Sequence, residues 1–458
     1  MRSTISLSLR MKTECCAASE LCWEANRETL LGSGNWVTAA LSFFICVSLN
    51  STLAQSAANV AQDQPGMVEE SVLPLDGSWH FQPAGGVERE IAVPSFWERQ
   101  PDLRTVHQGV YWRNFDVPES FRGRRILLRF DAVGDAADVS VNGQHAGEHV
   151  GPDLPFEVDI NGLVVAPSSS NRLEVAVRDD SFFSIPRQAK DWRNRKSWIP
   201  RGMGANNRKG LYQSVSMRAR PPIWLADARI QTSVRRREIS VHYQIFNSRP
   251  LTARARLKGE VLAVAGAAPL MTLARDDVEL PGYVTTTVAI TSPFGAGVEL
   301  WQPNHPTLYT LRTTLAGSAG SIARMETQFG FREVWFEGIH FYLNGIRCNL
   351  RGESPAYSEK AEMFATRNSA AEMVGRYQQA NFNVLRFHSM PAPAHVLQVC
   401  DELGMLVIDE SAIYASWMML MPEHPEWMDF CREHLVRGRR YSCCSMPHCQ
   451  SASGAYCP

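Results

Sequence analysis

The sequence lacks cysteine over its whole middle, since none occurs between Cys46 and Cys348 although the chain has 11 in all. This excludes a disulfide framework there, so the stability of that part must come from hydrophobic cores. The chain also lacks an excess of either charge, because 46 lysines and arginines oppose 47 acidic residues. Nothing in this balance favours nucleic acid or an anionic membrane surface as a partner.

Residues 72–220 lack any ten-residue helical period. They contain short alternating segments such as RILLRFDAV and RLEVAVRDD, separated by turn signals, which is the pattern of β-strands. Asn142-Gly143 is a favoured two-residue hairpin turn. A Pro-Pro linker begins at Pro221, and further strand patterns follow. We therefore predict two successive β-sandwiches, at residues 72–220 and 221–332.

From Glu333 on, strand and helix patterns alternate, which predicts an α/β architecture. The predicted strands are about 347–351, 383–387 and 405–408, and the predicted helices are roughly 366–380, 392–403 and 425–436. In the second helix one face carries Val396, Leu397, Cys400 and Leu403, and Gly404 ends it. The apolar run at 405–408 predicts a parallel strand buried on both faces.

Polar side chains lie where these strands are predicted to end. They are Arg351, Glu353, Arg386, His388, Asp409 and Glu410. Parallel strands bring their carboxyl ends to one rim, and (β/α)8 barrels carry out their chemistry there. The six residues are therefore candidates for substrate binding. The alternative, which we favour for Arg386 and Glu410, is a salt-bridge network that holds the rim together.

Several motifs occur in a defined order along the chain. They are DGSWHF, GVYWRNFDVP, VNGQHAGEHVGPDLPFEVDI, WQPNHPTLYTL, TQFGFREVWFEGIHFYLNGIRCNLRGES and NFNVLRFHSMPAPAHVLQVCDELGMLVIDE. Over roughly residues 73–437 this series resembles family 2 glycoside hydrolases, the clan of β-galactosidases, β-glucuronidases and β-mannosidases. The resemblance implies a jelly-roll sugar-binding domain at 72–220, an immunoglobulin-like sandwich at 221–332 and the first three units of a (β/α)8 barrel at 333–437.

The resemblance also implies a retaining, β-galactosidase-like enzyme that acts on β-glycosides without an organic cofactor or a metal. Retention needs two carboxylates, which the family supplies as glutamates on the fourth and seventh barrel strands. Only 105 residues run from Glu333 to Arg437, whereas a barrel takes ~250. We therefore expect a truncated barrel and an inactive chain. The alternatives are a non-catalytic carbohydrate-binding or interaction protein, and a product of a damaged gene.

Three details depart from the family or match it only loosely. The family usually places its histidine one residue after His388, where this chain has Ser389, and Glu353-Ser354 replaces an Asn-x-His. Asp179-Asp180 loosely matches a family loop that brings an aspartate to the sugar, although a surface turn is the alternative. The aromatic loop with Trp192, Trp198 and Arg201 is either a sugar-stacking platform or interface packing.

The amino end carries an apolar run at residues 37–49, followed by small residues up to Ala54. This predicts a leader with a secretory signal at 1–54 and a polar linker at 55–71. The run is too short for a comfortable transmembrane helix. We expect a secreted or periplasmic protein whose mature chain begins near Gln55. A buried hydrophobic segment is the alternative.

The carboxyl end, residues 438–458, has neither helical nor strand periodicity and is rich in cysteine. A shifted reading frame is the simplest interpretation of this change. A zinc site is the alternative, with Cys443, Cys444, His448, Cys449 and Cys457 as ligands. That spacing differs from the C-x2-4-C pairs that structural zinc sites favour.

Overall fold

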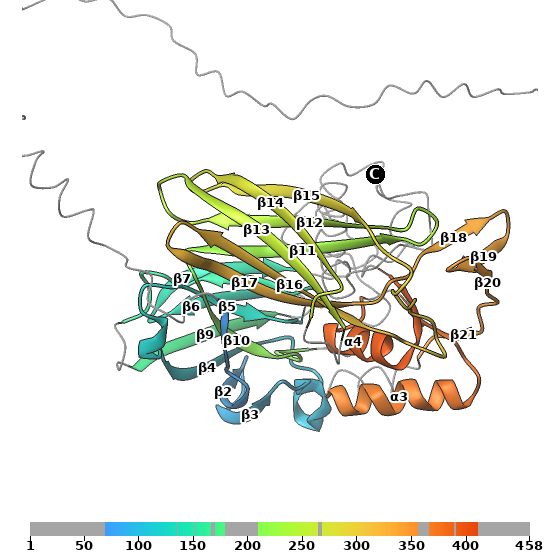
Figure 1. Cartoon of the computed structure of the whole chain (residues 1–458). Coiled ribbons are helices and arrows are strands. Elements are labelled where there is room, and N and C mark those ends of the chain that lie inside the picture. Colours follow the sequence, from blue (N-terminus) through green and yellow to red (C-terminus); the bar gives the residue numbers. More distant parts are fainter. Residues whose placement is uncertain are drawn as a thin grey trace, which may run out of the picture. The chain divides into compact units, whose positions relative to one another are not determined.

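The structure is a computed structural model (Figure 1). The described residues are 69–134, 136–151, 153–165, 170–178, 209–263, 268–355, 366–388 and 391–410. The predicted signal, most of the linker, Asp179-Asp180, the aromatic loop, the helix at 425–436 and the cysteine-rich tail lie outside these residues. The described part is mostly β-sheet with few helices.

The first region consists of two antiparallel sheets, and most of its strands alternate buried and more exposed residues. Its strands are β1 (Ser71–Pro74), β2 (Gly77–Pro83), β3 (Arg89–Val93), β4 (Gln108–Asp116), β5 (Arg125–Phe130), β6 (Ala136–Val141), β7 (Gln144–Val150), β8 (Phe156–Asp159), β9 (Ser170–Arg178) and β10 (Val215–Arg220). Short 3-10 turns lie at Trp97–Arg99, Pro101–Leu103 and Glu119–Phe121. The sheet orders are β1-β10-β5-β8 and β3-β2-β4-β9-β6-β7.

Both sheets contribute side chains to one core. Trp79 and Phe81 come from the six-stranded sheet, and Leu128 and Met217 come from the four-stranded sheet. The predicted Asn142-Gly143 hairpin is confirmed: it joins β6 to β7 with φ angles of 51° and 75°. Two successive positive φ angles match the right-handed twist of the flanking strands.

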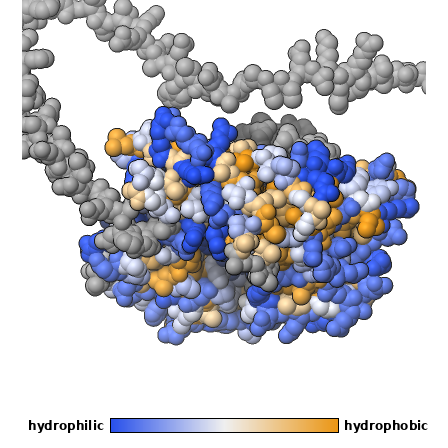
Figure 2. Space-filling view, in the orientation of Figure 1, coloured by the Kyte–Doolittle hydropathy of each residue, from blue (hydrophilic) through white to orange (hydrophobic). Residues whose placement is uncertain are grey.

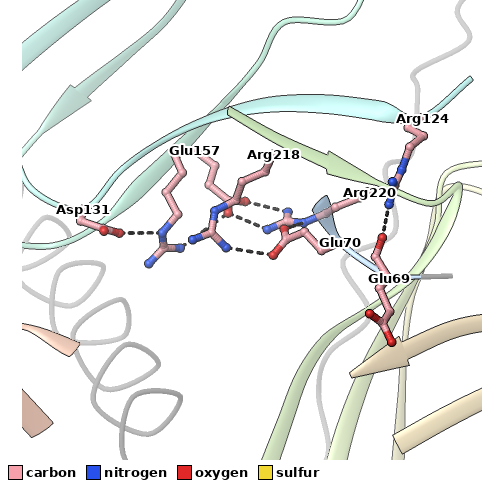
Figure 3. Close-up of polar contacts among 8 residues, drawn as sticks. Glu69, Glu70, Arg124, Asp131, Glu157, Arg218 and Arg220 are labelled. Carbon is pink, nitrogen blue, oxygen red and sulfur yellow. Dashed lines mark hydrogen bonds and ion pairs between the residues drawn. The ribbon is translucent and has the colours of Figure 1, made fainter. Parts of the chain in front are cut away.

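The outer face of the four-stranded sheet carries alternating arginines and carboxylates (Figure 3). This arginine–carboxylate ladder consists of Glu70, Arg129, Asp131, Glu157, Arg218 and Arg220. Glu70 receives bonds from Arg218 at 2.9 Å and Arg220 at 2.7 Å. Arg220 also donates two bonds to Glu157, at 2.8 and 2.6 Å. The ladder therefore connects all four strands of that sheet, or the residues beside them, by side-chain contacts.

The second region also consists of two antiparallel sheets. Its strands are β11 (Ile223–Ser233), β12 (Glu238–Asn247), β13 (Ala253–Ala263), β14 (Met271–Leu280), β15 (Thr285–Pro293), β16 (Tyr309–Gly317) and β17 (Gly320–Phe329). The sheet orders are β11-β12-β15 and β14-β13-β16-β17. Tyr243 from the first sheet and Leu257, Leu311 and Phe329 from the second are buried in a shared core. We call this region the second sandwich.

Residues 334–347 form a small antiparallel sheet of β18 (Val334–Glu337), β19 (His340–Leu343) and β20 (Ile346–Arg347). The alternation of strands and helices therefore begins later than Glu333, and Leu343-Asn344-Gly345 forms the hairpin that the resemblance to the family implies before the first barrel strand. Asn344 and Gly345, with φ angles of 54° and 90°, form a two-residue turn that reverses the chain. The predicted strand at 347–351 is wrong, because Arg347 already belongs to β20.

The parallel unit comes next. It contains β21 (Gly352–Glu353), α3 (Arg367–Gln379), β22 (Val384–Phe387), α4 (Ala394–Leu403) and β23 (Leu406–Asp409), and its sheet order is β21-β22-β23. Two of the three predicted helices, at roughly 366–380 and 392–403, are confirmed. Thr366 and Ser369 cap α3 reciprocally, and Gly404 ends α4 in a left-handed conformation. The two helices lie side by side (Figure 1).

The helices cover one face of the parallel sheet. Val396, Leu397 and Cys400 of α4 are buried as predicted, but Leu403 is 38% exposed and Val399 is buried in its place. The prediction that residues 405–408 are buried on both faces is wrong, because Ile408 is 37% exposed. On this second face, Leu406 packs against a cluster that contains Trp301, Phe341 and Leu343, whereas Ile408 toward the carboxyl end is open.

Within the described part, neither α3 nor α4 combines the length and the hydropathy that crossing a membrane requires. On the face shown in Figure 2, apolar surface (orange) is broken up by polar side chains (blue). Such a mixture is ordinary for protein surfaces.

Candidate functional site

Three of the predicted site residues meet at the carboxyl ends of β22 and β23. Arg386 Nε lies 2.5 Å from Glu410 Oε1, and His388 Nδ1 lies 3.3 Å from Glu410 Oε2. The parallel register explains the meeting, because Phe387 is opposite Asp409, so the residues that follow them are neighbours. We call Arg386, His388 and Glu410 the rim cluster. The salt bridge predicted at the rim is confirmed for Arg386 and Glu410.

The rim cluster is partly open to solvent. The Arg386 side chain is 49% exposed, and the side chains of His388 and Glu410 are 29% and 28% exposed. The cluster combines nitrogen donors with a carboxylate acceptor at one place. Groups of this kind can hydrogen-bond and orient a polar ligand with several hydroxyl groups.

Glu353 and Asp409 lie near this rim, but the pleat turns them away. Glu353 is in register with Leu385, so its side chain shares the face that α3 and α4 cover, opposite to that of Arg386. Its Oε1 accepts a hydrogen bond from the Ser354 amide at 2.8 Å. Asp409 Oδ1 accepts one from the Ala392 amide at 2.8 Å, which holds the loop before α4.

Arg351 lies at the opposite end of the parallel sheet, so its predicted place at the carboxyl rim is wrong. The first strand begins only at Gly352, after Arg351. The Arg351 side chain donates to the Asn381 carbonyl at 2.8 Å and to Asn381 Oδ1 at 3.1 Å, on the loop that precedes β22. These bonds hold the amino end of the sheet.

A buried cluster that the sequence did not reveal joins α4 to the second sandwich. Trp301 Nε1 donates to the Asp401 carbonyl at 2.7 Å, and Arg332 Nη2 lies 2.9 Å from Asp401 Oδ1. The Arg332 guanidinium lies over the Trp301 ring at 4.2 Å from its centre. A Cβ on Gly404 would come within 2.2 Å of the Pro303 carbonyl oxygen. The three residues Trp301, Arg332 and Asp401 form what we call the helix anchor.

A partial signal for the helix anchor is present in the sequence. Each of its residues lies in a motif noted above: Trp301 in WQPNHPTLYTL, Arg332 in the FGFR segment and Asp401 in DELG. What the motifs do not reveal is that these three segments meet. Their contacts position α4 against the second sandwich.

The described residues contain no group of three or more His, Cys, Asp or Glu side chains placed to hold a metal ion. The free cysteines among them are Cys348 and the buried Cys400. Burial raises the pKa of the Cys400 thiol far above its ordinary value, so this thiol stays protonated and is a poor nucleophile. The residues of the zinc alternative lie outside the described part.

Comparison with known families gives two matches, one after the other along the chain. The sequence model described as "Glycosyl hydrolases family 2, sugar binding domain" matches residues 67–221. The model described as "Glycosyl hydrolases family 2" matches residues 223–332. This chain belongs to glycoside hydrolase family 2.

Relatives within the family are distant and longer. A β-galactosidase of Thermoanaerobacter pseudethanolicus is 25% identical over 370 residues, which are 77% of this chain and 45% of that protein. A β-glucuronidase of Felis catus is 27% identical over 371 residues, which are 74% of this chain and 54% of that protein. The chain thus spans about half the length of the curated relatives it matches.

The fold matches solved structures of the same family. A β-glucuronidase of Bacteroides uniformis superposes with a TM-score of 0.68 at 22% identity, covering 83% of this chain and 46% of the other. A β-glucuronidase of Bifidobacterium dentium, solved with coumarin-3-O-glucuronide, has a TM-score of 0.60 at 24% identity. It covers 76% of this chain and 62% of that one. At such identities the likeness concerns the fold.

Proposed function

We propose that this family 2 chain provides the substrate-binding part of a retaining O-glycosyl hydrolase that acts on β-glycosides, in the manner of β-galactosidases. Family membership supports the reaction class and a carbohydrate substrate. Both β-galactosidases and β-glucuronidases occur among the relatives, so the sugar is the finer part of the proposal.

The proposed architecture is a jelly roll, an immunoglobulin-like sandwich and the first units of a (β/α)8 barrel. The two pairs of antiparallel sheets support the first two parts, and the consecutive parallel order β21-β22-β23 supports the third. In this arrangement the carboxyl ends of β22 and β23 face the substrate.

The observation that carries the proposal is the rim cluster. Arg386 and His388 would donate hydrogen bonds to sugar oxygens, and Glu410 would accept them from sugar hydroxyls. Because these side chains are partly exposed, a sugar can replace their mutual hydrogen bonds with its own. The cost is small, since a solvent-exposed ion pair contributes only ~0–1 kcal/mol. Asp179 and Asp180 from the amino-terminal region remain candidates for further contacts, whereas the side chain of Glu353 lies on the opposite face of the sheet from Arg386.

We further propose that residues 1–458 by themselves bind a glycoside without hydrolysing it. Retaining hydrolysis needs an acid and a nucleophile ~5–5.5 Å apart. At the described rim, Glu410 is already shared by Arg386 and His388, and Asp409 is used by Ala392. Turnover of aryl β-galactosides or β-glucuronides by the purified chain, abolished by Glu410→Gln, would contradict this proposal.

A binding measurement tests the rim site directly. Calorimetric titration with methyl β-D-galactopyranoside and with methyl β-D-glucuronide should give the tighter binding for the galactoside. Glu410→Gln and Arg386→Met should each weaken this binding roughly tenfold or more, because each removes a charge-assisted hydrogen bond. A matched control is Arg312→Met, since Arg312 pairs with Glu326 at 2.8 Å on β16 and β17, away from the rim.

A second candidate function, non-catalytic carbohydrate binding by the amino-terminal region, is favoured by the match of residues 67–221 to a sugar-binding domain. The same titration separates the two candidates. Binding that survives in both rim variants at the affinity of the unchanged chain would favour the amino-terminal region over the rim.

Export is the remaining part of the proposal. We propose that residues 37–54 act as a secretory signal, on the sequence pattern alone. Mass spectrometry of the protein exported by a bacterial host should find an amino terminus near Gln55. An intact Met1 in a cytoplasmic product would contradict it.

A further inference from the structure

A groove of about 500 Å3 lies on the second sandwich, beside α4. Its walls come from β13, β16, β17, the segment that precedes β16, and Glu402 of α4. This volume is within the ~300–1,000 Å3 of typical small-molecule sites. No residue of the rim cluster lines it, so the groove is separate from the site proposed above.

The polar groups of the groove are mainly hydrogen-bond acceptors. Glu299 Oε2 lies 3.1 Å from His305 Nε2 and accepts a bond from Thr307 Oγ1 at 3.2 Å. The bond with His305 is the main cause that holds the pKa of Glu299 below its usual value. Both bonds end on Oε2, so Oε1 remains an acceptor for a ligand. The Gln328 side chain adds an amide to the same groove.

The second carboxylate of the groove carries its own counter-charge. Glu402 forms an ion pair with Arg367 of α3. The groove therefore offers acceptor oxygens without a large unbalanced negative charge. This favours neutral hydroxyl groups over an organic cation, which would gain little from a carboxylate that is already paired. An anion such as phosphate would find acceptor oxygens on Glu299 and Glu402, and the described lining residues include no lysine or arginine to bind it.

The remaining wall is apolar. Leu270 is 49% exposed, and Pro306 and Leu308 also line the groove. A purely apolar ligand would take the polar groups of the groove out of water without replacing their hydrogen bonds, which is costly. A pyranose satisfies both requirements, since it has one face of C–H groups and an edge of hydroxyls.

We propose that this groove is a second binding site for a neutral saccharide, separate from the rim cluster. A sugar would lay its C–H face on Leu270 and Pro306 and direct hydroxyls toward Glu299 and Gln328. The inference rests on the groove alone, so it stands or falls independently of the function proposed for the rim.

The test uses the full chain carrying Arg386→Met, which weakens the rim site. Ligand-observed NMR titrations are run with methyl β-D-galactopyranoside and methyl β-D-glucopyranoside as neutral sugars. Spermidine serves as the cation and inorganic phosphate as the anion. We expect saturable binding of at least one of the two sugars, and weaker binding of spermidine and phosphate.

Two substitutions then locate the binding. Glu299→Ala and Leu270→Ser should each raise the Kd for the bound sugar roughly tenfold, by removing an ionised acceptor or the apolar wall. The matched controls are Glu279→Ala and Leu251→Ser, which change an exposed glutamate and an exposed leucine outside the groove and should leave the Kd unchanged.

Three outcomes would overturn the proposal. They are no saturable sugar binding in the Arg386→Met chain, a Kd that neither groove substitution changes, and tighter binding of spermidine or phosphate than of either sugar. Circular dichroism of each variant confirms that the fold is retained. Loss of sugar binding in Arg386→Met with intact binding in the unchanged chain would support the rim site and refute the groove, so the two proposals fail separately.

Discussion

The two antiparallel sandwiches and the parallel unit both bury apolar side chains against sheets, but on different numbers of faces. In each sandwich, two sheets close on one core, and Phe81, Leu128 and Leu257 are fully buried. In the parallel unit, α3 and α4 cover one face of β21–β23, while Ile408 on β23 stays 37% exposed. Within the described residues, the second face of the parallel sheet is covered at its amino end by the cluster of Trp301, Phe341 and Leu343 and is open at its carboxyl end. Each sandwich therefore contains its own core, whereas the parallel unit depends on side chains of its neighbours.

The edge of the sheet shows the same difference. Within the described residues, β23 is hydrogen-bonded to β22 on one side and to no strand on the other. An unpaired edge of this kind is a liability for stability and solubility. The helix anchor, which joins Asp401 to Trp301 and Arg332, is one of the contacts that tie the parallel unit to its neighbours. Phe96 and Tyr212 of the first region also share a hydrophobic cluster with α3 and α4.

The largest expected effect is a difference in protease resistance between the two sandwiches and the parallel unit. Limited proteolysis of the 458-residue chain should cut the region after about Glu333 first and leave a resistant fragment that ends between Arg324 and Glu333. The reason is that the parallel sheet, with Ile408 37% exposed at its carboxyl end, has less burial to oppose local unfolding. Mass spectrometry of the fragments gives the boundary. In a monomeric sample, equal protection of residues 381–410 and of the first region would contradict the comparison.

The second-largest effect is expected from substitutions in the helix anchor. Asp401→Ala leaves the Arg332 guanidinium buried without its carboxylate, which typically costs about 3–5 kcal/mol. Urea unfolding followed by tryptophan fluorescence, together with hydrogen exchange in α4, should show this loss in the parallel unit. Glu326→Ala breaks an exposed pair on β17 and is the control, with an expected change below about 1 kcal/mol. Equal losses of stability in the two variants would show that the helix anchor stabilises the parallel unit no more than an exposed ion pair does.

A smaller effect is expected from the arginine–carboxylate ladder in the first region (Figure 3). Burial alone would raise the pKa of Glu157, but the bonds from Arg220 and the nearby Arg129 hold it below its ordinary value. A lowered folded-state pKa stabilises the fold above the unfolded value of ~4.3, and this stability is lost as pH falls through the folded pKa.

Glu157→Gln should therefore lower the stability of the first region by about 1–2 kcal/mol at pH 7. It should also flatten the fall of Tm with pH below about pH 5. Calorimetric scans from pH 3 to pH 7 measure both. Glu119→Gln, which changes an exposed pair with Arg122, is the control. An unchanged acid limb in Glu157→Gln would assign the acid sensitivity to other groups.

The smallest effect is expected at the rim cluster. Arg386→Met should change the free energy of unfolding by less than about 1 kcal/mol, because the pair with Glu410 is open to solvent. The same substitution should weaken sugar binding, so the rim would contribute to ligand affinity more than to stability. A large loss of stability in urea unfolding would instead show that the salt bridge between Arg386 and Glu410 mainly stabilises the fold.

Much of the local structure could be predicted from the sequence because local signals control it. Thr366 with Ser369, and Gly404, mark helix ends through hydrogen bonds and backbone angles that neighbouring residues determine. The Asn142-Gly143 turn is local in the same sense. The first parallel strand was misplaced because the Asn344-Gly345 turn extends an antiparallel sheet into residues that also suit a parallel strand.

The site was predictable only in part, because contacts between distant segments decide it. The register of β22 and β23 brings Arg386, His388 and Glu410 together, which strand periodicity anticipates. The same pleat turns Asp409 toward Ala392, a consequence that depends on which face α4 covers. The pairing of Arg332 with Asp401 depends on how α4 docks on the second sandwich, and no sequence period records that.

The helix anchor also has a consequence for the order in which the chain acquires its structure. Trp301 and Asp401 are 100 residues apart, and Trp301 and Arg332 both precede Asp401 along the chain. During synthesis from the amino terminus, the second sandwich therefore leaves the ribosome before α4 has been translated. The nascent helix meets a surface already in place, and the sandwich acts as a template on which the parallel unit assembles.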